Sequence, residues 1–306
     1  MTEAALDLNE IRDMNGVTET PSKFQEAFLA IKEKTEKQFG VKLHDGMRRI
    51  SRDMYHSVTP KTPFMLQFIV AEIIDALGQN NEKLSIKNPL GVYNLCAGIG
   101  RSYTLGKGWT LGRVVTEGDV GSFYGSHSAD VDMVHHVHGC AGRSFMNNAL
   151  QGMGIVDGVA DEGAGQVNHG ASILIKGKAG ARLGWGQRAG NIVTLKNIPL
   201  NAGLFMAGGS IITLGDEVDE ELGPDMQEGT IYVPYAHDHI CGKGAACKKI
   251  EEIDYARIKD ALKPFEQELN IIGLTEFNQN TTFLTVDGKA LDFSKFYKIL
   301  PERFKI

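Results

Sequence analysis

Apolar, β-branched segments recur along the middle of the chain at a nearly constant spacing. Each segment follows a glycine, and these glycines are Gly152, Gly170, Gly190, Gly209 and Gly229, about nineteen residues apart. A strand of roughly five or six residues cannot bury its own apolar face, but it can when equivalent strands stack on it about 4.8 Å away. The pattern therefore predicts strands stacked in parallel as the coils of a β-solenoid.

Glycine-rich units separate these strands. They read GDVGSFYG from Gly118, GCAGRSFM from Gly139, GVADEGAG from Gly158 and GKAGARLG from Gly177, with weaker copies NIPLNAGL from Asn197 and GDEVDEELG from Gly215. Glycine adopts positive φ without steric cost and lets neighbouring turns approach closely, so these units are expected to form the corners of the coils. The expected corner glycines are Gly118, Gly121, Gly125, Gly139, Gly142, Gly152, Gly158, Gly170, Gly177, Gly180, Gly184, Gly190, Gly209 and Gly229. A phosphate-binding loop would instead lead from a strand into a helix.

The two flanks of the repeat have helical patterns. Residues 22–39 carry apolar side chains on one helical face, and residues 63–77 are apolar nearly all round, which predicts a buried helix. Residues 254–269 predict a helix with a kink at Pro264, and TTFLTVDGKALDF predicts a hairpin that turns at Asp287-Gly288. The chain is thus divided into a mainly helical region 1–87, a β-helix 88–250 and a helix-and-hairpin extension 251–306.

The units GDVGSFYG and GKAGARLG, with the strands AGNIVTLKN, MAGGSIITLGD and QEGTIYV, resemble the GXGXG repeat family. This family includes the C-terminal domain of the glutamate synthase large subunit. It also includes the stand-alone subunits of split glutamate synthases and N-methylglutamate synthase, and the β-helical subunit of formylmethanofuran dehydrogenase. The resemblance covers roughly residues 88–250 and implies a right-handed parallel β-helix of about six to seven coils. The chain departs from the repeat at Met146, Asn197, Leu200 and Leu204, where the pattern has glycine.

The resemblance implies a non-catalytic scaffold subunit of a multi-subunit, glutamate-synthase-like enzyme. Its partners would be glutaminase-type and flavin-binding, synthase-type chains, so FMN and iron–sulfur clusters would belong to the partners and none to this chain. One alternative is a scaffold in a formylmethanofuran dehydrogenase or a formyltransferase/hydrolase-type complex. A second alternative is an enzyme with a histidine-lined metal site on the β-helix.

Composition and charge narrow the setting. The hydrophobic fraction of 42% and the charged fraction of 23% are typical of a soluble globular protein, and a net charge of -6 argues against nucleic-acid and anionic-membrane partners. No apolar run reaches the length of a membrane span, and the acidic N-terminal sequence lacks the apolar core of a secretory signal. The four cysteines suit a reducing cytoplasm, which is the expected location.

Histidines and cysteines provide the candidate chemistry. In MVHHVH, His136 and His138 share one face of the expected strand, while His135 faces the other way. Two imidazoles can bind a metal only with further ligands, and the sequence shows none nearby, so no stoichiometric metal is expected. A second group combines histidines with a Cys-x5-Cys spacing wider than that of most zinc sites, and it comprises His237, His239, Cys241 and Cys247.

Aromatic residues provide the candidate interfaces. Trp185 lies between two glycines of a turn, where its side chain is expected at the surface or in a contact with a partner. Phe64 and Phe68 belong to a segment more apolar than one buried face requires, so they are candidates for a partner contact or a solenoid cap. No serine lies in a nucleophile elbow, and no flavin or iron–sulfur motif is present.

Overall fold

The structure is a computed structural model that describes residues 3–7, 82–87, 112–129, 132–237 and 239–302, together with Glu33, Glu36, Lys37 and Leu77. Of the helices expected near the N-terminus, only these four residues are described, and all four are helical; Phe64 and Phe68 lie outside the described residues. Among the described residues, no helix is long and apolar enough to cross a membrane.

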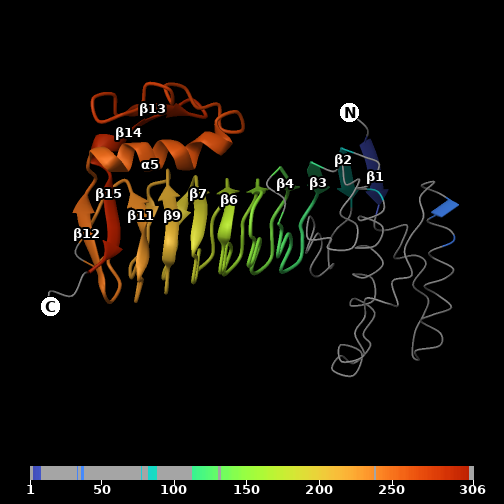
Figure 1. The fold of residues 1–306 in the computed structure, drawn as a ribbon, viewed down its shortest axis with the longest axis horizontal. Coiled ribbons are helices and arrows are strands. Elements are labelled where there is room, and N and C mark those ends of the chain that lie inside the picture. Colours follow the sequence, from blue (N-terminus) through green and yellow to red (C-terminus); the bar gives the residue numbers. More distant parts are fainter. Residues whose placement is uncertain are drawn as a thin grey trace.

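One long sheet organises the described part of the chain (Figure 1). Its strands, in spatial order, are β1 (Glu3–Asp7), β2 (Lys83–Lys87), β3 (Arg113–Glu117), β4 (Val134–His138), β5 (Met153–Val156), β6 (His169–Ile175), β7 (Ala189–Thr194), β9 (Ala207–Thr213), β11 (Glu228–Val233), β15 (Tyr297–Pro301) and β12 (Ala245–Lys249). Every pairing from β1 to β11 is parallel. The predicted β-solenoid is confirmed, with about six turns.

The inner face of this sheet is the core of the solenoid. The strand register aligns Ile173, Ile192, Ile211 and Ile231 in one row, and all four are fully buried. Each isoleucine therefore packs on the isoleucines of the coils before and after it. This stacking explains why short strands, which are unstable alone, form a continuous core here.

The return path of each coil runs through a chain of left-handed residues. In one coil Arg182, Gly184 and Gly186 have φ of 60°, 64° and 64°, and in the next coil Asn201 and Phe205 flank Gly203 in the same alternation. The equivalent trios of the other coils are Phe123-Gly125-His127, Ser144-Met146-Asn148, Gly163-Gly165-Val167 and Glu221-Gly223-Asp225. Many of these positions are not glycine, although left-handed backbone costs an L-residue about 1–2 kcal/mol. Hydrogen bonds to the neighbouring coil hold the non-glycine positions in place, such as Met146 N–H to Tyr124 O at 2.8 Å.

Only half of the expected corner glycines have positive φ. Those that do are Gly118, Gly125, Gly152, Gly184, Gly190, Gly209 and Gly229. Those that do not are Gly121, Gly139, Gly142, Gly158, Gly170, Gly177 and Gly180. Close approach explains most of this second group, because a Cβ on Gly177 would lie 2.2 Å from Gly158 O and one on Gly180 would lie 2.6 Å from Glu162 N. At these positions glycine allows one coil to stack directly on the backbone of the next.

The coil in which Asn197, Leu200 and Leu204 depart from the glycine pattern is one residue shorter than that alignment assumes. Gly203 N–H bonds Leu183 O in the way that Gly184 N–H bonds Ala164 O, so Gly203 occupies the third glycine position of this coil. Asn197 does not replace a glycine. Its side chain accepts from Ala179 N–H at 2.8 Å and donates to Ala179 O at 3.0 Å, where it supports a small parallel sheet of β8 (Asn197–Ile198) and β10 (Glu217–Val218). Bridges between Val120, Ala141, Ala160 and Ala179 continue this second side through the earlier coils.

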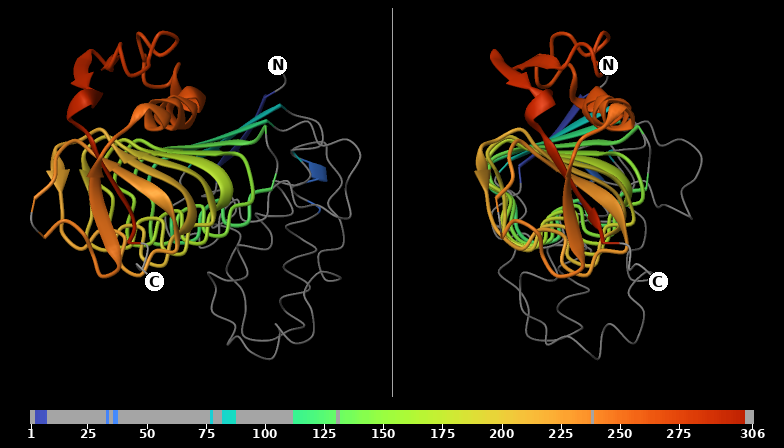
Figure 2. Two further views of the ribbon diagram at one scale, coloured as in Figure 1. Left: turned by 60° about the vertical axis from the view of Figure 1, so that its left-hand side comes forward. Right: turned by 90° about the vertical axis from the view of Figure 1, so that its left-hand side faces the viewer.

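A C-terminal extension lies across the outer face of the sheet (Figures 1 and 2). It comprises α5 (Glu252–Leu262), the 3-10 turns η2 (Lys263–Phe265) and η3 (Phe293–Lys295), and the hairpin of β13 (Phe283–Val286) and β14 (Lys289–Asp292). The predicted helix gives way to the 3-10 turn that contains Pro264. The predicted hairpin turns at Asp287 and Gly288, whose φ values of 46° and 78° suit a two-residue hairpin turn.

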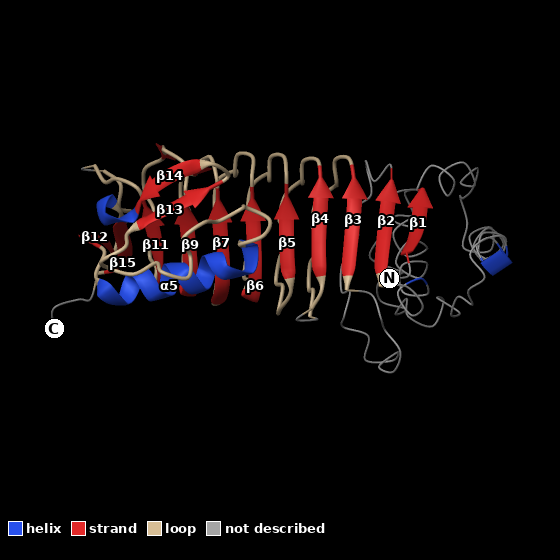
Figure 3. Cartoon of the chain, turned by 90° about the horizontal axis from the view of Figure 1, so that it is seen from above, coloured by secondary structure: helices blue, strands red, loops and turns tan. Residues whose placement is uncertain are grey.

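The extension buries a second apolar cluster. Outward-facing Ile155, Leu174, Val193 and Ile212 pack with residues of α5, η2 and the hairpin. Tyr232 belongs to the same cluster and donates its hydroxyl to Asp254 at 3.0 Å. Figure 3 shows that α5 runs over the strands from β12 towards β6 and stops short of β5. The outer sides of the first strands are thus beyond the reach of this helix.

Candidate functional site

A cluster of charged and histidine side chains lies on the outer face of the sheet, near β4 and β6. Strand register places His138 beside Glu117. Asp157, which follows Val156, and Lys176, which follows Ile175, continue the same row. His138, Asp157 and Lys176 therefore come from three consecutive coils. Glu268, in the segment that follows η2, approaches the same place from the extension.

Asp157 is the centre of this cluster. Its Oδ2 lies 2.6 Å from His138 Nδ1, and its Oδ1 lies 3.1 Å from His136 Nε2 and 3.0 Å from Lys176 Nζ. Partial burial alone would raise the pKa of this carboxyl. The hydrogen bonds from His138, His136 and Lys176 together outweigh burial and hold the pKa of Asp157 at about 2. Asp157 is consequently an ionised acceptor at neutral pH.

Lys176 joins the solenoid to the extension. Its Nζ donates both to Asp157 and to Glu268. Burial lowers the pKa of this ammonium group, but the hydrogen bonds to Glu268 and Asp157 outweigh burial and raise the pKa above its ordinary value. The ammonium group thus remains charged between two carboxylates.

Arg113 defines the proton position on His136. Arg113 Nη2 lies 3.0 Å from His136 Nδ1, and a guanidinium only donates, so Nδ1 accepts and Nε2 carries the hydrogen that points to Asp157. His136 is 5% exposed, and burial lowers its pKa despite the nearby carboxylates. His136 is therefore a neutral donor that orients Asp157.

His138 is the exposed histidine of the cluster. Its Nδ1 donates to the ionised Asp157, which leaves Nε2 for other contacts, and the side chain is 39% exposed. This carboxylate–histidine arrangement is the one that orients a histidine as a proton acceptor or as a metal ligand. Of the two histidines in this cluster, His138 is the one with access to solvent.

The structure adds Asp157 to the two histidines found in the sequence. One ligand atom from each of the three residues lies within 4.8 Å of the others, which is the spacing of a possible metal site. Sequence reasoning missed Asp157 because it lies in another strand segment. The nineteen-residue repeat carries the signal, since Asp157 lies one period after His138.

The charges around this trio do not favour a divalent cation. Lys176 and Arg113 already balance Asp157 and Glu268. Moreover, the 2.6 Å separation between His138 Nδ1 and Asp157 Oδ2 is a direct hydrogen bond. Because His136 Nδ1 accepts a hydrogen bond from Arg113, Nε2 carries the ring hydrogen, and a metal at Nε2 would have to displace it.

His135 faces the interior of the solenoid, as the alternation of the strand predicts. It is fully buried, its Nε2 lies 3.2 Å from Ser128 Oγ, and its ring packs edge-on against Tyr124 with centroids 5.8 Å apart. Burial lowers its pKa to about 4. His135 is thus an uncharged core residue at neutral pH.

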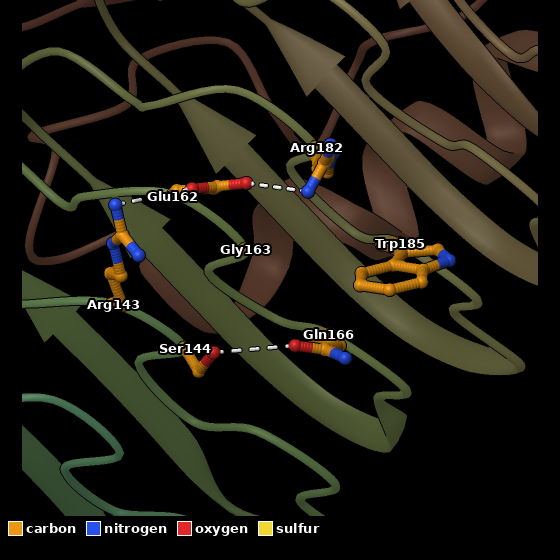
Figure 4. Close-up of a pocket in the computed structure, with 7 residues that line it drawn as sticks. All are labelled: Arg143, Ser144, Glu162, Gly163, Gln166, Arg182 and Trp185. Carbon is orange, nitrogen blue, oxygen red and sulfur yellow. Dashed lines mark hydrogen bonds and ion pairs between the residues drawn. The ribbon is translucent and has the colours of Figure 1, made fainter.

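Trp185 lies at a shallow pocket of about 170 Å³ on the turn side of the solenoid (Figure 4). Glu162 there joins Arg143, at 3.7 Å, to Arg182, at 2.7 Å. The guanidinium of Arg182 lies 5.8 Å from the centre of the Trp185 ring. Ser144 and Gln166 complete the lining with a hydrogen bond of 3.2 Å.

The second candidate group separates into parts. Cys241 and Cys247 are half-buried and pack against the inner core of the solenoid. Within the described part of the chain, His136, His138 and Asp157 are the one trio with metal-ligand spacing, so His237 and His239 do not complete a site with the two thiols.

No family model and no curated protein matches this chain. Membership of the GXGXG repeat family therefore stays a prediction from the motifs.

Proposed function

We propose that this protein is a scaffold subunit of a multi-subunit, glutamate-synthase-like enzyme and has no activity of its own. The solenoid supports this proposal because its sides are long, regular surfaces that suit docking of other chains. The resemblance of its repeat to the GXGXG family supports the kind of complex. Glutaminase-type and flavin-binding, synthase-type chains are the proposed partners, and FMN and iron–sulfur clusters would lie in them.

The observation that carries the proposal is the composition of one surface, which we call the turn ridge. It consists of Arg143, Arg182, Trp185, Leu200 and Phe205. Leu200 and Phe205 are 44% and 48% exposed, and both lie in the coil next to that of Arg182 and Trp185. Aromatic residues and arginine are enriched in protein–protein interfaces and supply most of their hot spots.

Native purification tests the proposal. We expect the tagged chain, expressed in its own cells, to co-purify with a larger flavin-binding chain that mass spectrometry identifies. Trp185→Ala combined with Phe205→Ala should remove that chain. Phe283→Ala is the matched control, because Phe283 is 60% exposed but lies on the hairpin of the extension. A purified chain that turns over an amide substrate with no second protein would overturn the proposal.

The identity of the captured chain also separates the alternatives. A formylmethanofuran-type complex would use the same solenoid with different partners. Recovery of formylmethanofuran dehydrogenase-type or formyltransferase/hydrolase-type subunits instead of flavin-binding chains would favour that alternative.

An enzyme with a histidine-lined metal site is the second candidate function, and Asp157 is the observation in its favour. Because Lys176 and Arg113 balance the charges of Asp157 and Glu268, we expect elemental analysis to find far less than one metal ion per chain. One zinc or iron per chain, lost in His138→Ala and kept in His237→Ala, would establish the metal site instead.

A further inference from the structure

The pocket beside Trp185 carries more positive than negative charge. Among the described residues that line it, Arg143 and Arg182 are cationic and Glu162 is the one carboxylate. Glu162 Oε1 accepts a hydrogen bond from Arg182 Nη1 at 2.7 Å, whereas its Oε2 lies 3.7 Å from Arg143 Nη2. Asp161, which does not line the pocket, lies 3.8 Å from Arg143 Nε. Both contacts of Arg143 are longer than a hydrogen bond, so its guanidinium keeps donors for a further acceptor.

A second donor borders the same space. Ser144 Oγ donates to Gln166 Oε1 at 3.2 Å, so the amide carbonyl of Gln166 is engaged, while its amide nitrogen has no hydrogen-bond partner among the described residues. Figure 4 shows this nitrogen on the side of the amide that is nearer to Trp185. Gly163 lies between these side chains and adds none of its own, which leaves the centre of the pocket open. The guanidinium of Arg143 and the amide nitrogen thus border one open space, and both groups only donate.

The size of the pocket suits one side chain. Its volume is about 170 Å³, whereas sites for drug-sized ligands and cofactors usually measure roughly 300–1,000 Å³. Trp185 forms one wall, and because its chain neighbours are Gly184 and Gly186, neither neighbour places a side chain beside the ring. Small pockets that combine an aromatic ring with arginine are typical of the points where protein interfaces anchor a partner's side chain.

We propose that this pocket receives an aspartate or glutamate side chain of the partner chain, an inference that rests on the scaffold function proposed above. The carboxylate accepts hydrogen bonds from Arg143 and from the amide nitrogen of Gln166, while Glu162 continues to hold Arg182. A cationic side chain would meet two guanidinium groups. An apolar side chain would cover the donors of Arg143 without supplying an acceptor, which costs free energy.

Apolar residues of the turn ridge flank this charged contact. Leu200 and Phe205 lie in the coil after that of Trp185, and both are exposed. A partner that covers them also excludes water from the pocket, and a charge-assisted hydrogen bond is stronger where water is excluded. The acidic side chain is therefore expected beside apolar residues of the partner.

Cross-linking tests the occupant directly. Arg143→Lys places a primary amine at the pocket, and a carbodiimide joins such an amine to a carboxylate in contact with it. In the complex purified from native cells, we expect position 143 to be linked to an aspartate or glutamate of the partner chain. Arg188→Lys is the matched control, because Arg188 is exposed but does not line the pocket, so position 188 should not form this link. Coupling of position 143 only within its own chain would overturn the proposal.

A charge change of nearly constant shape gives a second test. Gln166→Glu puts a carboxylate beside the one that the partner is expected to supply, so about tenfold less partner chain should be retained. Gln227→Glu adds the same charge at an exposed position outside the pocket and should retain as much as the wild type. Full retention by Gln166→Glu would contradict an acidic occupant.

The scaffold function and the acidic contact fail in different ways. If no second chain co-purifies with the wild type, both are wrong. If a second chain co-purifies but position 143 forms no link to it, the scaffold function stands and the acidic contact alone is wrong.

Discussion

The inner and outer faces of the long sheet are both apolar, but they find their partners in different ways. Inner residues such as Ile173 and Ile192 pack on equivalent residues one coil away. Outer residues such as Leu174 pack on the extension, which begins roughly eighty residues later in the chain. The inner face is therefore stabilised by repetition and the outer face by a single tertiary contact. The His138–Asp157 cluster lies where that tertiary contact ends.

The largest effect is expected where coils stack without side chains. Gly180→Val places a Cβ 2.6 Å from Glu162 N and 2.8 Å from Asp161 C, and these backbone atoms cannot give way without separating the coils. We expect a loss of about 4 kcal/mol in the free energy of unfolding, measured by urea denaturation. Gly244→Ala is the control, because its left-handed backbone costs about 1 kcal/mol and no atom lies within 4 Å of its Cβ. Equal losses for the two variants would show that close stacking is not the constraint at Gly180.

Removal of an outer side chain should show whether the two faces of the sheet lose stability independently. Leu174→Ala leaves a cavity under the extension, so we expect a loss of about 3 kcal/mol. Hydrogen exchange should show that the amides of α5 lose protection, while the amides that pair β6 with β7 keep theirs. Ile173→Ala, which empties the inner row of the same strand, should reduce protection of the strands as well. Identical exchange patterns in the two variants would mean that the faces unfold as one unit.

The inner histidine should make stability depend on pH. The pKa of His135 is about 4 in the folded chain, against an ordinary value of 6.5, so the unfolded chain binds the proton first. The contribution is fully present above pH 6.5 and is lost as the pH falls to about 4, by about 3 kcal/mol. Urea denaturation across this range should show the loss, and His135→Gln should remove this part of it. An NMR titration of His135 with a midpoint near 6.5 would contradict the expectation.

The smallest effect is expected at the outer cluster. Asp157→Asn removes the negative charge and replaces one of the two acceptor oxygens with a donor, but the carboxylate is one-third exposed, so solvent screening limits the loss to about 1 kcal/mol at neutral pH. Because the folded pKa of about 2 lies below the ordinary value of 3.8, this stability is present above pH 4 and is lost as the pH falls through 2. The variant and the wild type should therefore converge in stability near pH 2. A constant difference across that range would show that Asp157 acts by shape and not by charge.

The sequence predicted the parts of the fold that depend on local pattern. The spacing of Gly170, Gly190 and Gly209 predicted the coils, and Asp287-Gly288 predicted the hairpin. The sequence could not separate glycines such as Gly180, which need close approach, from those such as Gly184, which need positive φ, because both reasons select the same residue.

The candidate site was only half predictable. The alternation of a strand places His136 and His138 together, but Asp157 joins them through stacking of coils and Glu268 through the position of the extension. The nineteen-residue spacing between His138 and Asp157 could have predicted the first of these contacts. The second depends on how α5 crosses the sheet, which no local pattern encodes.

The antiparallel insertion of β15 between β11 and β12 has a consequence for the order of events during synthesis. Each coil from β3 to β11 can dock on its predecessor as soon as the ribosome releases it, since its partner has already been made. β12 is made before its described partner exists, and it must wait until residues 297–301 emerge. The far end of the solenoid should therefore close late, in a single step that seals the last coil.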